Sequence, residues 1–184
     1  MTNQEITRPA LLNPWRLLGW GIVATLIAIP AVATLFFGFT GWTGEDFLAA
    51  IIMLGGVGLA FEMAMRASGS WAYRGGAAVA LGAALLLLWA NGAVGIVGNE
   101  GNAINLWFNL VPLVALFGAI GARFKARGMA AAMTATAVFQ LVVGVIVQSY
   151  GHFAWVFTGI WFGAWMVSAY LFRKAAAQAG DQAA

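Results

Sequence analysis

Every Lys and Arg of this chain lies on one side of a ladder of six hydrophobic segments, and the other side carries none. A helix needs about 20 apolar residues to cross a bilayer core about 30 Å thick. Six segments approach that length, at residues 17–37, 47–65, 76–98, 104–122, 129–147 and 153–172. The sequence therefore predicts an all-α integral membrane bundle of six transmembrane helices.

The connectors between the segments alternate in charge. One side holds Arg8, Arg16, Arg66, Arg74, Arg123, Lys125, Arg127, Arg173 and Lys174. The other side holds Glu45, Asp46, Glu100 and His152. Because basic loops stay in the cytoplasm, this pattern predicts that both termini are inside, the N-in/C-in orientation.

The composition of the chain indicates that the lipid bilayer is the main partner of the protein's surface. Charged residues make up 8% of the 184 residues and hydrophobic residues 62%, whereas a soluble domain is about 25% charged. The net charge of +3 is explained by loop residues that set orientation, so no nucleic-acid partner is expected. With no Cys and a single His, we expect no metal site and no cofactor.

Short connectors predict one domain. We expect a cytoplasmic tail at residues 1–12, a six-helix transmembrane domain at 13–174 and a second cytoplasmic tail at 175–184. The first segment also resembles a cleavable signal peptide, with Arg16, an apolar run at 17–29 and Ala31-Val32-Ala33. Its apolar run continues to Phe37, which favours retention as a spanning helix. Cleavage would leave five helices.

Polar residues inside the segments fall on helical faces. Three faces are Asn91, Gly95 and Gly98; Asn105, Asn109 and Pro112; and Thr136, Gln140, Gly144, Gln148 and His152. Pro30 and Pro112 each lack an N–H and obstruct a carbonyl one turn earlier. Because lipid offers no hydrogen-bond partners, these groups are expected to face one another. The predicted polar pocket, in the outer half of the bundle, is formed by Asn91, Asn105, Asn109, Gln140 and Gln148.

A structural alternative explains the same residues. Asn and Gln in spanning helices often only bridge neighbouring helices, at about 0.6 kcal/mol each. Glycines such as the Gly159–Gly163 GxxxG pair likewise predict close helix contacts.

Loop residues form a second candidate site at the outer mouth, made of Glu100, Asn102 and His152. Glu100 and His152, with the acids Glu45 and Asp46, would hold a divalent ion or sense pH if they meet. Local structure competes with this interpretation. Asn102 is a candidate N-cap of the fourth helix, and Thr43-x-x-Asp46 fits a capping box. Glu62, an acid within a span, is positioned to pair with Arg66 four residues on.

The run from Asn91 to Asn105, NGAVGIVGNEGNAIN, resembles a segment of small uncharacterised bacterial inner-membrane proteins that reads N-x-AVGI-x-G-x-E-x-N-x-x-N. The turn Arg127-Gly128-Met129 is also similar to theirs. The resemblance implies a multi-pass protein of the bacterial plasma membrane and implies no activity.

The sequence therefore predicts a membrane protein that binds or conducts a small solute or ion through an outward-facing polar pocket. The alternative is a structural or accessory protein that associates with itself, as a homo-oligomer, or with a membrane complex. An enzyme is not expected, since the chain has no HExxH motif and no Ser–His–Asp set.

Overall fold

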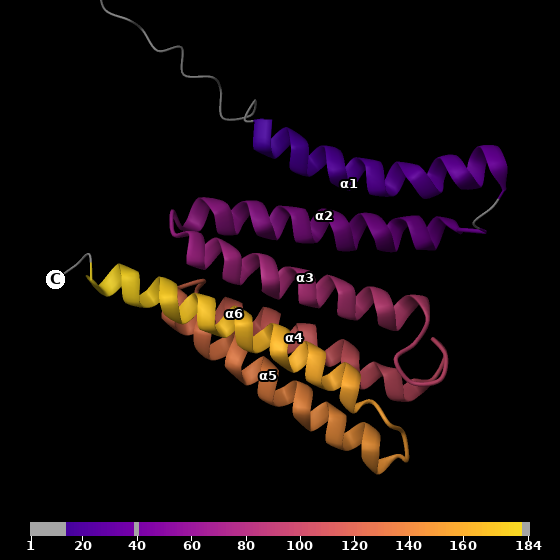
Figure 1. Cartoon of the computed structure of the whole chain (residues 1–184). Coiled ribbons are helices and arrows are strands. Elements are labelled where there is room, and N and C mark those ends of the chain that lie inside the picture. The colour runs from indigo at the N-terminus through magenta and orange to yellow at the C-terminus, as the bar shows by residue number, and fades with distance from the viewer. Residues whose placement is uncertain (1–13, 39–40, 182–184) are drawn as a thin grey trace, which may run out of the picture. The chain divides into compact units, whose positions relative to one another are not determined.

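A computed structural model describes residues 14–38 and 41–181 of the chain, and nearly all of them are helical (Figure 1). The elements are α1 (Pro14–Val32), the π-helical turn η2 (Ala33–Phe37), α2 (Gly44–Ala67), α3 (Trp71–Ala93), the 3-10 turn η3 (Ala103–Asn105), α4 (Leu106–Gly121), α5 (Ala126–Ser149) and α6 (Trp155–Asp181). Within the described residues, six helices are long and apolar enough to cross a membrane. The predicted all-α architecture is confirmed.

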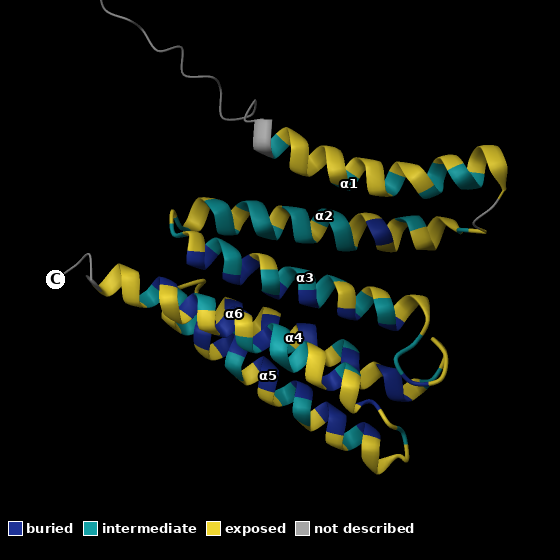
Figure 2. Cartoon of the chain, viewed as in Figure 1, coloured by how far each residue is buried: buried dark blue, intermediate teal, exposed yellow. Residues whose placement is uncertain are grey.

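The chain divides into two compact units, residues 1–59 and 60–184. The first holds α1, η2 and most of α2, and the second holds the end of α2 and α3 to α6. The division falls inside α2, and the single transmembrane domain expected at residues 13–174 stays a prediction. Burial explains the division: no described residue of α1 is buried and α2 buries only Ala50 (Figure 2).

The two predicted tails differ in what the structure describes of them. The N-terminal tail at residues 1–12, with Arg8, lies outside the described residues. The C-terminal tail was expected from Ala175 onward, but α6 continues to Asp181. Ala175 is buried, with 4% of its surface exposed. The helix therefore extends beyond its apolar segment because part of this extension still packs on the bundle.

Two helix starts follow local sequence patterns. At α2 the Asp46 carboxylate accepts a hydrogen bond from the Thr43 N–H at 2.7 Å, and the Asp46 N–H donates to the Thr43 hydroxyl at 3.4 Å. This is the reciprocal pairing of a capping box, so that prediction is confirmed. At α3 the Ser70 hydroxyl oxygen accepts from the Tyr73 N–H at 3.4 Å. Arg66 also pairs with Glu62, as its spacing predicted.

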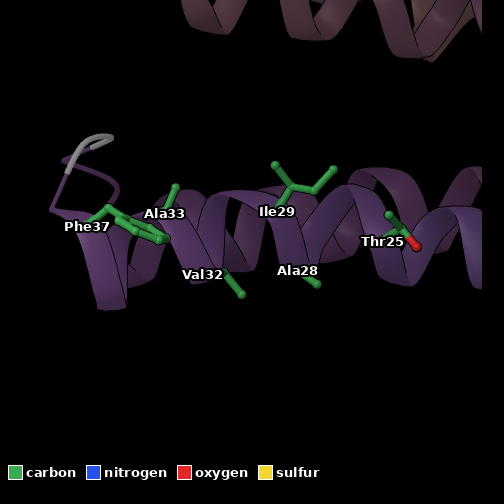
Figure 3. Close-up of a pocket in the computed structure, with 6 residues that line it drawn as sticks. All are labelled: Thr25, Ala28, Ile29, Val32, Ala33 and Phe37. Carbon is green, nitrogen blue, oxygen red and sulfur yellow. The ribbon is translucent and has the colours of Figure 1, made fainter.

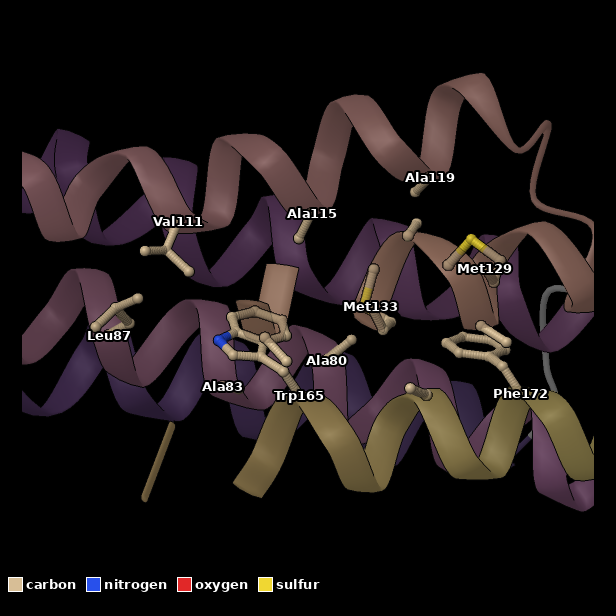
Figure 4. Packing of buried hydrophobic residues seen from close by; sticks show 14 of the residues in the cluster. Ala80, Ala83, Leu87, Val111, Ala115, Ala119, Met129, Met133, Trp165 and Phe172 are labelled. Atoms are coloured by element: carbon tan, nitrogen blue, oxygen red, sulfur yellow. The ribbon is translucent and has the colours of Figure 1, made fainter. Parts of the chain in front are cut away.

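The second unit has a continuous core. α6 packs against both α3 and α5, and α4 packs against α5. The largest fully buried apolar side chains come from all four helices: Leu87, Phe108, Val111, Met133, Trp165 and Phe172. Figure 4 shows Leu87, Val111, Met133, Trp165 and Phe172 in this core. This bundle of α3 to α6 positions the candidate site.

Glycines allow these helices to approach closely, as the sequence predicted for glycines in spanning segments. A Cβ built on Gly118 would lie 2.8 Å from the Ala132 Cβ, and one on Gly144 would lie 2.8 Å from the Thr158 Cγ2. The first contact joins α4 to α5 and the second joins α5 to α6. The GxxxG pair differs, since no atom lies within 4 Å of a Cβ at Gly159 or Gly163.

Candidate functional site

The loop after α3 is built around two glycines. The sequence placed Gly95 and Gly98 on a helical face with Asn91, and this prediction is wrong because α3 ends at Ala93. Gly95 and Gly98 have φ values of +74° and +72°, which favour glycine. A Cβ on Gly95 would lie 2.3 Å from the Asn99 carbonyl carbon. The loop therefore folds back tightly on itself, and only glycine fits at position 95.

Asn105 holds this loop from the start of α4. Its Oδ1 accepts from the Val97 N–H at 2.9 Å, and its Nδ2 donates to the carbonyls of Val97 at 3.1 Å and Asn99 at 2.7 Å. Asn102 acts beside it, because its Oδ1 accepts from the Ile104 N–H at 3.1 Å. Asn102 thus caps the turn η3 that leads into α4, as its predicted N-cap role requires.

Asn91 links the end of α3 to α4. Its Nδ2 donates to the Asn105 carbonyl at 2.8 Å and to the Asn109 Oδ1 at 2.7 Å. Asn91 and Asn105 are buried and Asn109 is half-buried. Three of the five predicted pocket residues therefore meet. Their contacts hold α3 to α4 and α4 to the loop between them. This is the bridging role that the sequence offered as the structural alternative to a pocket.

The two glutamines of α5 lie in different environments. Gln148 is exposed near the end of the helix. Gln140 is fully buried, and neither its Oε1 nor its Nε2 has a hydrogen-bond partner among the described groups. No hydrogen bond joins Gln140 to the three asparagines. A buried amide without a partner is rare and costs about 1–3 kcal/mol.

Two more unpartnered groups lie on α6, one on either side of the level of Gln140. The Thr158 hydroxyl and the Trp165 indole N–H are buried and make no hydrogen bond with the described groups. Thr158 faces Gly144, and Gln140 lies one turn from Gly144, about 6 Å along α5. Trp165 lies about 10 Å along the antiparallel α6 from Thr158. Gln140 is therefore level with the stretch between Thr158 and Trp165.

Three neighbouring polar groups of α5 and α6 do have partners. The Thr136 hydroxyl donates to the Ala132 carbonyl at 2.9 Å within α5. On α6 the Trp161 indole donates to the Ala83 carbonyl at 2.9 Å, and the Ser168 hydroxyl donates to the Gly76 carbonyl at 2.8 Å. The contrast singles out Gln140, Thr158 and Trp165, which we call the Gln140 layer. The Trp165 indole nitrogen lies on the side of the ring nearer Leu87 (Figure 4).

Sequence analysis had identified Gln140 as a pocket residue, but it had not identified Thr158. A hydroxyl two turns from Trp165 on one helical face was the available signal.

The predicted outer-mouth residues do not pair. Glu100 is exposed and His152 is half-buried, and the described chain shows no hydrogen bond or ion pair between them. Across residues 14–38 and 41–181 no group of three or more His, Cys, Asp or Glu side chains is arranged to hold a metal. Asn102 is occupied by its capping bond.

A shallow groove of about 370 Å³ follows α1 and η2 (Figure 3). Its lining is Thr25, Ala28, Ile29, Val32, Ala33 and Phe37. The one hydroxyl there, of Thr25, donates to the Gly21 carbonyl at 2.8 Å. This surface is apolar and offers no group for chemistry.

No protein-family model, curated protein or solved structure matches the chain. Unused hydrogen-bonding capacity in the described bundle lies at the Gln140 layer and at the buried Asn91 Oδ1, which also has no partner, and Gln140 is the side chain of which neither polar atom is bonded.

Proposed function

We propose that this is a multi-pass protein of the bacterial inner membrane, with both termini in the cytoplasm, that binds or conducts a small polar solute at the Gln140 layer. Two observations support the membrane placement. Large apolar side chains are exposed along every long helix, including Phe36, Phe117 and Val156, and such patches are rare on soluble monomers. All Lys and Arg lie at one side of the six segments.

The observation that carries the solute proposal is the unpartnered amide of Gln140. In a helix surrounded by lipid and apolar side chains, an amide oxygen and an amide NH₂ have no water to bond. The Thr158 hydroxyl and the Trp165 N–H add a donor-acceptor and a donor on α6, one on either side of the level of Gln140. A molecule of a few heavy atoms that both donates and accepts hydrogen bonds would bond Gln140 and one of these two groups at a time, since Thr158 and Trp165 lie about 10 Å apart along α6.

The layer favours a neutral solute over an ion. No charged side chain is buried in the described part of the chain; its buried polar groups belong to neutral side chains such as Asn, Gln, Thr and Ser. An ion inside a bilayer needs compensating charge or several converging carbonyl groups. Glycerol and urea have the required size, neutrality and hydrogen-bonding groups, so they are suitable probes.

Proteoliposome swelling tests the proposal. Vesicles that contain the wild-type protein are expected to swell in glycerol or urea faster than empty vesicles. Gln140→Leu and Thr158→Val are expected to reduce that rate at least about tenfold, the effect of losing about 1.4 kcal/mol of stabilisation. Thr136→Val is the matched control, because its buried hydroxyl is already bonded within α5.

Equal rates for wild-type and empty vesicles, together with no thermal stabilisation of the protein by either probe, would refute solute binding. So would a Gln140→Leu variant that behaves like wild type. Fluorescence-detected unfolding in detergent checks that each variant is folded.

A second candidate function rests on Gly159 and Gly163. Apart from the adjacent backbone of α6 itself, no atom of the described residues lies within 4 Å of either Cβ position, so these two glycines do not pack against another helix of the described bundle. GxxxG faces bring two helices together in membranes. This observation favours an oligomerising or accessory protein. Gly159→Leu and Gly163→Leu would then shift a detergent-solubilised oligomer to monomer in light scattering, whereas Gly82→Leu, at another open position on α3, would not.

A further inference from the structure

The end of the bundle opposite the asparagine loop carries a basic groove. It lies between α5 and α6 and has a volume of about 440 Å³. Its lining consists of Arg127, Ala130, Ala131, Arg173, Ala176 and Ala177. We propose that this groove binds the phosphate group of an anionic phospholipid, with Arg127 and Arg173 as the ligands.

The two arginines enter the groove at different levels. Arg127 belongs to the first turn of α5. Arg173 comes from α6, and its Nη2 donates to the Thr134 hydroxyl oxygen at 3.3 Å. Thr134 lies seven residues beyond Arg127, about 10 Å along the helix. The Arg173 guanidinium thus contacts α5 about two turns beyond the position of Arg127, and the rest of the groove lining is alanine, which leaves room for a ligand.

The turn that leads into α5 is held in place. Arg123 and Phe124 have φ values of 50° and 57°, a left-handed conformation that is uncommon for such residues. The Tyr73 hydroxyl donates to the Phe124 carbonyl at 2.7 Å and ties this turn to α3. Because the turn is anchored, the first turn of α5 and Arg127 have a defined position.

Charge in this region is not balanced within the protein. In the part of the chain that the structure describes, no carboxylate pairs with Arg123, Lys125, Arg127, Arg173 or Lys174. Arg66 and Glu62 do form an ion pair, but both residues belong to α2. Guanidinium groups bind phosphate through paired charge-assisted hydrogen bonds. An anionic ligand therefore complements this end of the bundle.

A lipid fits better than a free anion because of what adjoins the groove. The same helices expose apolar side chains further along, such as Val138 and Val142 on α5 and Val167 on α6. A phospholipid supplies a phosphate for the arginines and acyl chains for that surface, and basic pockets between spanning helices at the cytoplasmic side bind such headgroups. The inference rests on the membrane placement proposed above and not on the solute site.

Binding is tested on the full-length protein in detergent, after removal of bound lipid. Dioctanoyl phosphatidylglycerol is expected to raise the unfolding temperature, whereas dioctanoyl phosphatidylcholine and inorganic phosphate are not. Arg127→Ala and Arg173→Ala are each expected to weaken the apparent phosphatidylglycerol affinity about tenfold, or about 1.4 kcal/mol. Lys174→Ala removes the same charge one residue away from the groove lining and is expected to leave the affinity unchanged.

Ala131→Leu is a second variant that fills the groove without changing any charge. It is expected to abolish the stabilisation by phosphatidylglycerol. If Lys174→Ala weakens binding as much as Arg173→Ala, the attraction is unspecific surface charge and the proposal is wrong. An equal response to inorganic phosphate would indicate an anion site and also overturn the lipid assignment. The Gln140→Leu variant is expected to bind the lipid normally, so failure of the solute proposal is recognised separately.

Discussion

At the scale of single residues, Asn105 is the side chain whose substitution would remove three buried or part-buried hydrogen bonds at once. Its side chain satisfies three backbone groups of the α3–α4 loop, at Val97 and Asn99. Each buried polar group left without a partner costs about 1–3 kcal/mol. We therefore expect Asn105→Ala to lower the free energy of unfolding by at least about 2 kcal/mol. Thermal unfolding in detergent, followed by tryptophan fluorescence, measures it.

Asn109→Ala is the matched control for that substitution. Asn109 accepts one hydrogen bond, from the Asn91 Nδ2, and it is only half-buried. Its loss is expected to be clearly smaller than that of Asn105→Ala. Equal losses would show that Asn105 does not hold the loop.

Gly95 and Gly92 provide a second comparison. A Cβ on Gly95 would meet the Asn99 backbone at 2.3 Å, at a φ of +74°, whereas a Cβ on Gly92 meets no atom within 4 Å. Gly95→Ala is therefore expected to lower stability by more than about 1 kcal/mol. Gly92→Ala, within α3, is expected to leave stability unchanged or raise it by up to about 1 kcal/mol. The reverse order in an unfolding series would contradict the loop geometry.

Contacts between residues close together in the sequence could be predicted, whereas contacts between residues far apart in the sequence could not. The Thr43–Asp46 capping box, the Asn102 cap and the Glu62–Arg66 pair each join residues within four positions, so spacing alone predicted them. The Asn91 contacts depend on how the loop from Val94 to Asn102 turns back. Whether Gln140 finds a partner depends on side chains of other helices, which no periodicity encodes.

At the scale of helices, Gly118 sets the distance between α4 and α5. A Cβ there would lie 2.8 Å from the Ala132 Cβ, so Gly118→Ala forces the two helices apart. Overpacking of this kind costs about 1–3 kcal/mol. We expect a lower unfolding temperature for Gly118→Ala and recovery in the double variant Gly118→Ala/Ala132→Gly, which restores the space.

Gly121→Ala serves as the control on the same helix, since no atom lies within 4 Å of its Cβ position. It is expected to leave the unfolding temperature unchanged. A double variant no more stable than Gly118→Ala would rule out this close contact as the cause.

Hydropathy predicted which segments are helical better than it predicted where they end. The segment expected at 76–98 corresponds to α3 at Trp71–Ala93, because its last residues are apolar enough for a span but contain the left-handed Gly95 and Gly98. The segment expected at 153–172 continues as α6 to Asp181. Apolar composition measures affinity for the bilayer, whereas a helix ends where backbone conformation or capping changes.

At the scale of the whole molecule, the charge distribution predicts an orientation that can be measured directly. The chain has no Cys, so single cysteines report their own positions. Glu100→Cys lies in the exposed loop after α3, and Lys174→Cys lies on α6 at the basic end. Since basic segments stay in the cytoplasm, a membrane-impermeant maleimide is expected to label Glu100→Cys in intact bacterial cells. Lys174→Cys is expected to react only after permeabilisation, and the opposite pattern would invert the orientation. Recovery of the protein in the soluble fraction without detergent would contradict the membrane placement itself.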